Sequence, residues 1–257
     1  MLIDPTLDQM LDFCARDPIE RVFLEDAARR GHSRFRAVQG ERGLDALCYF
    51  GANVVPSGRG CGAFAADAAS RMTRMIIGEE EAVGELWSAA RSVMPRPRED
   101  RPGQPVYVLD EAPPPGSSGL RAAQLEDLDI LVPACALTHE EELGVDPLRR
   151  DPIGFRRRTA AQIEEGRSWL WTEGETILFK AEASAWTPSA VQLQQVWVDP
   201  EARRMDHGTR GLSDLCRLLL EDTPSVCLFV RPENEPALRL YERVGMRRSG
   251  SYRSVLF

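Results

Sequence analysis

The sequence predicts a mixed α/β fold, in which helices cover a sheet of mixed strand direction. Short apolar runs such as residues 191–198 and 226–230 are rich in the residue types that favour strands. Between these runs, residues 208–221 place apolar side chains at the spacing of one buried helix face. A segment rich in proline and glycine, residues 111–119, separates two stretches of ordinary domain size. We therefore expect two domains, at residues 1–112 and 119–257, joined by a linker at 113–118.

The first domain is predicted to repeat the element order of the second. Its elements are a strand at 45–55, a glycine-rich loop at 57–62, a helix at 63–71, a strand at 75–77, a helix at 79–91, a proline-rich loop at 94–105 and a last strand at 106–109. We therefore interpret residues 1–112 as a degenerate second copy of the same fold. The G-x-G-x-G pattern in its loop is a weak motif, so this half is expected to support the other or to shape its cleft.

The second domain is predicted to follow the order β-α-α-β-β-β-α-β-α-β-β. Its elements are a strand at 120–124, helices at 127–142 and 155–165, strands at 167–172, 177–184 and 191–198, a helix at 208–221, a strand at 226–230, a helix at 235–244 and a hairpin at 246–257. Pro133 should kink the first of these helices or begin it anew. A Ser-Gly-Ser turn at 249–251 suggests the closing hairpin.

Composition argues against several classes of function. The 43% of hydrophobic and 28% of charged residues are typical of packed domains, and no apolar run approaches the roughly 20 residues that span a bilayer. The net charge of -8 is unfavourable for a nucleic-acid binder, and the run Arg156-Arg157-Arg158 is interpreted as a solvated helix face. The N-terminus lacks the basic flank of a signal peptide, so we expect a cytoplasmic protein. Six scattered cysteines and three distant histidines predict reduced packing thiols and no metal site.

The loop between the strand at 191–198 and the helix at 208–221 could bind an anion. A helix N-terminus presents unpaired N–H groups and the positive end of the helix dipole, which suit a phosphate group. Arg203, Arg204 and Arg210 add positive charge at this point. Many strand-to-helix turns carry glycine and arginine for structural reasons alone, so the next segment decides the interpretation.

A second motif follows at the expected distance. Residues 234–246 read N-x-x-A-x-x-L-Y-E-x-x-G-M, after a V-x-V-x-P strand end and the glycine/arginine loop. This pair of motifs resembles the GNAT superfamily of acyl-CoA-dependent N-acyltransferases, over residues 120–257. The chain also resembles a GNAT subgroup with an N-terminal domain of unassigned function, through Leu86-Trp87, the stretch 101–105, the strand 179–182 and the last residues 255–257.

The resemblance implies a set of cofactor-binding residues and an acyl-CoA as co-substrate, with acetyl-CoA as the first expectation. The strand end would contact the pantetheine arm, the loop would hold the pyrophosphate, and the implied residues are Val196, Trp197, Val198, Arg203, Arg204, Met205, Asp206, His207, Gly208, Thr209, Asn234 and Tyr241. Asp206 stands where the family has a glycine that lets phosphate approach the backbone. Its carboxylate either weakens phosphate binding or faces away and pairs with Arg204.

The resemblance further implies acyl transfer to an amine without a metal. Tyr241 matches the tyrosine that protonates the departing thiolate, and Asn234 also suits a helix N-cap. Glu182 is the first candidate for the base that deprotonates the amine, with Gln194 or Gln195 as alternatives that position water. The acceptor could be a small molecule, a peptide or a protein. The alternative function is a non-catalytic acyl-CoA sensor or scaffold. No nucleic-acid or membrane partner is expected.

Overall fold

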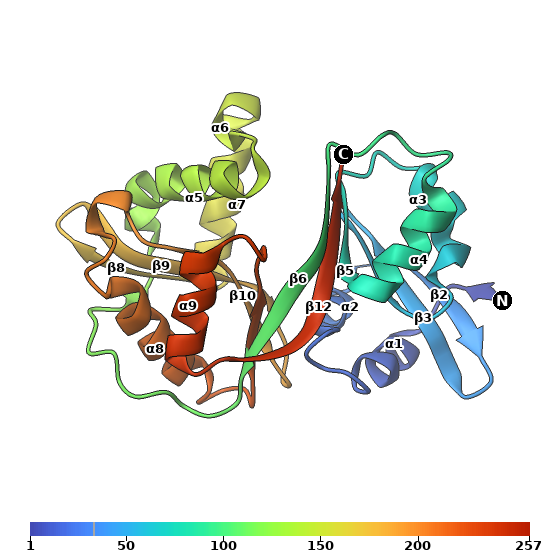
Figure 1. Ribbon diagram of the computed structural model, residues 1–257, viewed down its shortest axis with the longest axis horizontal. Helices are drawn as coiled ribbons and strands as arrows, with labels where there is room; N and C mark the ends of the chain where they lie inside the picture. Colours follow the sequence, from blue (N-terminus) through green and yellow to red (C-terminus); the bar gives the residue numbers. More distant parts are fainter. Residues whose placement is uncertain (33) are drawn as a thin grey trace.

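The computed structural model describes residues 1–32 and 34–257, and its strands form one continuous sheet (Figure 1). The N-terminal strands are β1 (Leu2–Ile3), β2 (Phe35–Gly40), β3 (Gly43–Phe50), β4 (Val54–Gly58), β5 (Met75–Glu79) and β6 (Glu99–Leu109). The C-terminal strands are β7 (Arg121–Ala122), β8 (Ser168–Glu173), β9 (Thr176–Trp186), β10 (Val191–Trp197), β11 (Val226–Phe229) and β12 (Arg247–Leu256). The order in the sheet is β1-β2-β3-β4-β5-β12-β6-β11-β10-β9-β8-β7, with parallel and antiparallel pairs. The predicted mixed α/β fold is confirmed.

Helices cover both halves of the sheet. The N-terminal half contains α1 (Leu7–Cys14), α2 (Val22–Arg29), the 3-10 turn η1 (Cys61–Phe64), α3 (Ala65–Ala69) and α4 (Glu80–Ala90). The C-terminal half contains the 3-10 turn η2 (Leu125–Asp127), α5 (Leu128–Leu143), α6 (Pro147–Arg150), α7 (Pro152–Glu164), the 3-10 turn η3 (Pro200–Ala202), α8 (His207–Leu219) and α9 (Glu235–Val244).

Local sequence signals place the two helices that matter for the site. In α8 the predicted apolar face, Leu212, Leu215, Cys216 and Leu219, is buried. Gly211 lies on the same face, where an added Cβ would stand 2.3 Å from Cγ of Phe179, so the close packing of α8 on β9 requires glycine. The Asn234 side chain accepts the Ala237 N–H at 3.3 Å and begins α9, and Gly245 ends it with a φ of 95°.

The terminal segment forms one strand, so the predicted hairpin at 246–257 is wrong. β12 pairs with β6 on one side and with β5 on the other, and a bulge between Arg248 and Gly250 replaces the expected turn. The chain does not fold back on itself because β6 already supplies the neighbouring strand. β6 itself begins at Glu99, within the segment predicted as a proline-rich loop, and its last four residues pair with β11.

The two halves therefore share strands across the middle of the molecule. In Figure 1, β6 and β12 run between the helices of the two halves. β6 pairs with β11 and β12 of the C-terminal half, and β12 pairs with β5 and β6 of the N-terminal half. Residues 113–118 lie between β6 and β7 without regular structure. The division into domains at 1–112 and 119–257 stays a prediction.

Two further expectations differ from the structure. The strand predicted at 45–55 is two strands, β3 and β4, because the chain turns at residues 51–53 and brings Phe50 opposite Val54. α5 runs unbroken through Pro133. Because η2 forms a separate turn before α5, Pro133 falls early in the helix and removes a single N–H donor from it.

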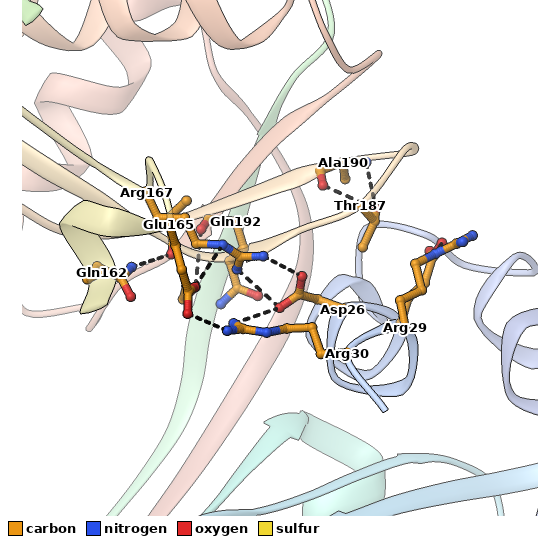
Figure 2. Close-up of polar contacts among 12 residues, drawn as sticks. Asp26, Arg29, Arg30, Gln162, Glu165, Arg167, Thr187, Ala190 and Gln192 are labelled. Carbon is orange, nitrogen blue, oxygen red and sulfur yellow. Dashed lines mark hydrogen bonds and ion pairs between the residues drawn. The ribbon is translucent and has the colours of Figure 1, made fainter. Parts of the chain in front are cut away.

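Helix α2 connects the N-terminal half to the sheet of the C-terminal half. Val22 is fully buried among Val108, Ala185, Ala190 and Cys227. Beside this contact, Arg167 donates two hydrogen bonds to the Asp26 carboxylate at 2.8 and 3.1 Å, and Arg30 bonds Glu165 at 2.6 Å (Figure 2). An apolar contact and a bidentate ion pair therefore fix the position of α2.

We expect the substitution Glu20→Gln to stabilise the protein above pH 5. Burial, with the charges of Asp17 and Glu79, raises the pKa of Glu20 from 4.5 to about 8. Between these values the folded state keeps a proton that the unfolded state has released, so the free energy of unfolding falls as the pH rises. Glutamine does not titrate, so the variant does not lose this free energy of unfolding as the pH rises. The gain should be near zero at pH 4.5 and reach about 1–3 kcal/mol at pH 8.

Urea unfolding of both proteins across this pH range measures the effect. Glu81→Gln, at an exposed position of α4, is the matched control and should change little at any pH. A gain for Glu20→Gln that does not depend on pH would contradict this explanation.

Candidate active site

The larger of two candidate cavities, of about 1110 Å³, lies at the end of β10, beyond the point where β10 and β11 stop pairing. The two parallel strands pair only through Val191 with Val226 and Gln192 with Cys227, within the described residues. The cavity is bordered by the end of β10, the following loop, the first turn of α8, one side of α9 and Glu141 of α5. Ten of the predicted cofactor-binding residues line it: Val196, Trp197, Val198, Arg203, Arg204, Asp206, His207, Gly208, Thr209 and Asn234.

The first turn of α8 offers unused hydrogen-bonding groups to this cavity. In the described part of the chain, no side chain caps the helix. His207 Nδ1 and Thr209 Oγ1 are buried without a hydrogen-bond partner. Because buried polar groups are almost always paired, these atoms and the free helix N–H groups fit a bound anion.

The three arginines near the loop have different roles. Arg203 and Arg204 line the cavity, and Arg203 also donates to the Val198 carbonyl at 3.1 Å and pairs with Glu141 at 3.4 Å. Arg210 instead bonds the carbonyl of Gly116 at 2.9 Å and holds the segment before β7. Two of the three loop arginines therefore line the cavity, and one of them, Arg203, already bridges to α5.

Asp206 does not pair with Arg204. Its carboxylate lies 3.8 Å from the Arg243 guanidinium, and both side chains are more than half exposed. The residue lines the cavity and is the N-cap of α8 with a φ of 61°. Glycine adopts this left-handed conformation without the steric cost that aspartate has.

We expect Asp206→Gly to tighten acetyl-CoA binding by about 2- to 10-fold. The substitution removes a negative charge beside the proposed phosphate position, and solvent with Arg243 screens that charge. Calorimetric titration measures the change in Kd. Asp206→Asn keeps the side-chain shape and removes the charge alone, so it should give most of the gain. An unchanged Kd in both variants would mean that the carboxylate does not affect the ligand.

The structure separates the two residues predicted on α9. Asn234 lines the cavity while it caps the helix. Tyr241 is buried, with its ring 5.6 Å from that of Tyr107, and it is absent from the described residues that line the cavity. Burial raises the pKa of Tyr241, which keeps the phenol protonated. Met205 is exposed outside the lining. The roles of these residues stay predictions.

Glu182 lies in a second cavity of about 310 Å³, within a network of polar side chains. Its carboxylate accepts a hydrogen bond from Cys135 Sγ at 3.1 Å and from Gln194 Nε2 at 3.3 Å. The buried Lys180 ammonium stands 3.7 Å away and also bonds the Gln195 side chain at 3.0 Å. Gln195 has a φ of 52° within the bulge of β10. This network holds Glu182 beside β10.

Glu142 is a titratable residue that the sequence did not single out. The residue is exposed overall, yet the surrounding protein partly desolvates its carboxyl group and raises its pKa to about 7. Its charge acts on both Glu182 and Tyr241, so it lies near the proposed base and the proposed acid. The sequence shows Glu142 only as the last of three consecutive glutamates, a pattern typical of a solvated helix end.

The glycine-rich loop of the N-terminal half is filled by the protein itself. Gly60 and Cys61 both donate their N–H groups to one oxygen of Glu85 at 2.7 Å, and Gly58 donates to Glu79 at 3.2 Å. Carboxylates thus occupy the positions that phosphate oxygens would need. This geometry favours a supporting role for the loop.

The residues around the larger cavity match a known protein family. The family model "Acetyltransferase (GNAT) family" matches residues 136–246, which include β10, the loop, α8 and α9. This match covers the segment that lines most of the larger cavity. A second model, "Domain of unknown function (DUF4081)", matches residues 33–131, so it extends past β6 into the start of the C-terminal half. No curated protein sequence matches the chain significantly.

Solved structures resemble the chain over its whole length. A GNAT-family acetyltransferase from Colwellia psychrerythraea has a TM-score of 0.61 at 10% identity and covers 100% of this chain and 98% of its own. A GCN5-related N-acetyltransferase from Sphaerobacter thermophilus has a TM-score of 0.59 at 16% identity, with 99% and 94% covered. A tandem GNAT protein from the clavulanic acid biosynthesis pathway has a TM-score of 0.56 at 12% identity, with 97% and 93% covered. The GNAT fold therefore extends over both halves.

Two features are absent from the described residues. No helix among the described residues has both the length and the apolar character needed to cross a membrane. Within residues 1–32 and 34–257, no group of three or more His, Cys, Asp or Glu side chains is placed to hold a metal ion.

Proposed function

We propose that the protein is an N-acyltransferase that transfers an acyl group, in the first instance acetyl, from acyl-CoA to an amine. The observation that supports it most is the cavity where β10 and β11 separate, with the uncapped N-terminus of α8 in its wall. Its volume of about 1110 Å³ is of the size that a large cofactor needs. The match of residues 136–246 to the GNAT family model agrees with this ligand.

The cavity residues suggest how CoA binds. The pyrophosphate would accept hydrogen bonds from the N–H groups of Gly208 and Thr209 and from the unpartnered His207 and Thr209 side chains. The pantetheine arm would run along the end of β10, where Val196 and Val198 have no parallel neighbour on β11 among the described pairs. Asn234 would contact the arm from the start of α9.

The proposed reaction is a direct transfer. The ammonium form of the amine loses one proton to Glu182, directly or through water, and the freed nitrogen lone pair forms the C–N bond to the thioester carbonyl carbon. The C–S bond then breaks and the thiolate takes the phenol proton of Tyr241. The second proton leaves the nitrogen and returns through water to Tyr241, while Glu182 releases the first proton to solvent. Tyr241 is neutral, as a proton donor must be. Holding the two substrates together supplies much of the rate.

Asp206 favours a second candidate function, a non-catalytic acyl-CoA sensor or scaffold. Its carboxylate lines the wall where the phosphates would lie and opposes a negative ligand. Such a protein would bind acyl-CoA weakly and transfer nothing.

Calorimetric titration with acetyl-CoA, followed by an assay of CoA thiol release with a mixture of amines, tests both candidates. We expect a Kd in the micromolar range and release that depends on an added amine. Binding without release by any amine would select the sensor. An absence of binding at millimolar acetyl-CoA would overturn both.

A further inference from the structure

The second cavity contains a concentration of positive charge that the transfer chemistry alone does not require. Besides Glu182, its lining includes Arg74, Arg150 and Arg158. Arg158 is paired with Asp151 at 3.3 Å. Among the described residues, neither Arg74 nor Arg150 has a carboxylate partner. The lining thus keeps two guanidinium groups without an ion pair among the described residues.

The carboxylates of Asp151 and Glu182 offset two of the three arginine charges in the lining, which leaves a formal charge of +1. His139 lies among the lining residues, and its partial burial with the charges of Arg158 and Arg74 lowers its pKa, so that it is neutral at pH 7. Because the charges of Arg74 and Arg158 both act on His139, the two arginines lie close to its imidazole. Arg74 precedes β5, and Arg158 lies on α7. The cavity is therefore net positive, in a protein of net charge -8.

The two cavities adjoin along β10 and α5. Gln194 and Gln195 line the smaller cavity, and the next residues of the strand, Val196 and Trp197, line the larger one. On α5, His139 belongs to the smaller cavity and Glu141 to the larger. A molecule in the smaller cavity would therefore lie next to the end of the proposed cofactor.

We propose that the smaller cavity binds the acceptor, and that this acceptor is an amine of amino-acid size carrying an oxyanion group, held by Arg74 and Arg150 with its amine toward Glu182. The inference rests on the proposed acyltransferase function and names its substrate class. A volume of about 310 Å³ is at the small end of ligand pockets and suits a small molecule. Guanidinium groups bind carboxylates and phosphates in bidentate geometry.

The inference also gives the N-terminal half a role in the reaction. Arg74 comes from that half, and its backbone is fixed by hydrogen bonds with Ala52 at 3.3 Å and Phe257 at 3.0 Å. Arg150 comes from α6 in the GNAT family segment. The acceptor site is thus completed by both halves of the chain.

Saturation-transfer NMR and thiol-release kinetics on the full chain test the acceptor class. The probes are the common amino acids, their carboxamides, phosphoethanolamine and spermidine. At least one carboxylate or phosphate amine should bind and react, and its carboxamide or the polyamine should be about 10-fold poorer or worse in kcat/KM. Comparing the amino acids with phosphoethanolamine shows which oxyanion the site prefers.

Arg74→Gln and Arg150→Gln test the assigned contacts. Each should raise the KM of the preferred acceptor by about 10-fold or more and leave the Kd of acetyl-CoA unchanged. Arg149→Gln is the matched control, because Arg149 adjoins Arg150 in sequence but its side chain is 87% exposed and pairs with Asp146. It should leave KM unchanged.

The outcomes separate this inference from the function on which it rests. If acetyl-CoA binds but carboxamides or spermidine react as well as the acids, the anionic acceptor is overturned. The acyltransferase function is then unaffected. The same holds if acetyl-CoA binds and no oxyanion-bearing amine binds or reacts. Failure of the function itself would appear in calorimetry as a protein that does not bind acetyl-CoA.

Discussion

Glu182→Gln is expected to lower kcat for acyl transfer by about 100- to 10,000-fold, with an unchanged Kd for acetyl-CoA. Glutamine fits the same space and can keep a hydrogen bond to its neighbours, but it cannot take a proton. Glu182 is held in the smaller cavity by Cys135 and Gln194, away from the lining of the larger one, so cofactor binding should not change. Steady-state kinetics and calorimetry measure the two quantities separately.

The control is Glu175→Gln, at the exposed turn between β8 and β9, which should keep full activity. Glu142→Gln tests the alternative base, whose pKa of about 7 also suits proton removal at neutral pH. If Glu142→Gln abolishes turnover while Glu182→Gln does not, the base is Glu142. Wild-type turnover in both variants would exclude a direct role for either carboxylate.

Arg167→Met is expected to lower the free energy of unfolding by about 2–4 kcal/mol. The Arg167 and Asp26 side chains are 12% and 8% exposed, and the substitution leaves the Asp26 carboxylate buried without its bidentate partner (Figure 2). Arg30 remains 3.9 Å from Asp26 and limits the loss. Urea unfolding, followed by circular dichroism, measures the change.

Two further variants show whether burial causes this loss. Arg239→Met breaks the exposed pair with Glu235 and should cost no more than about 1 kcal/mol. Adding Asp26→Leu to Arg167→Met removes the unpaired charge and should recover much of the stability. A double variant as unstable as the single one would show that the loss comes from packing of the arginine stem and not from the stranded carboxylate.

The sequence predicted those parts of the fold whose causes are local. The helix α8 follows from apolar residues at helical spacing, and α9 from Asn234 at its start and Gly245 at its end. The larger cavity was predictable for the same reason. The end of β10, the loop and the start of α8 are consecutive in the chain, so one stretch of sequence contains them.

Features that depend on contacts between distant segments were not predictable in this way. Residues 246–257 have the turn residues of a hairpin, and only the presence of β6 beside them makes a single strand preferable. Arg74 and Glu142 belong to no motif and reach the site through the packing of whole elements. The Tyr241 motif is local, yet its side chain packs on Tyr107 from the N-terminal half.

The position of β12 has a consequence for folding during synthesis. β5 emerges from the ribosome early, but its partner on one side is β12, which is made only after the whole of the C-terminal half. Until then β5 carries an unpaired edge, and such edges favour aggregation. We infer that the N-terminal half stays incompletely folded through most of translation, and that a nascent chain stalled before residue 247 would need a chaperone to remain soluble.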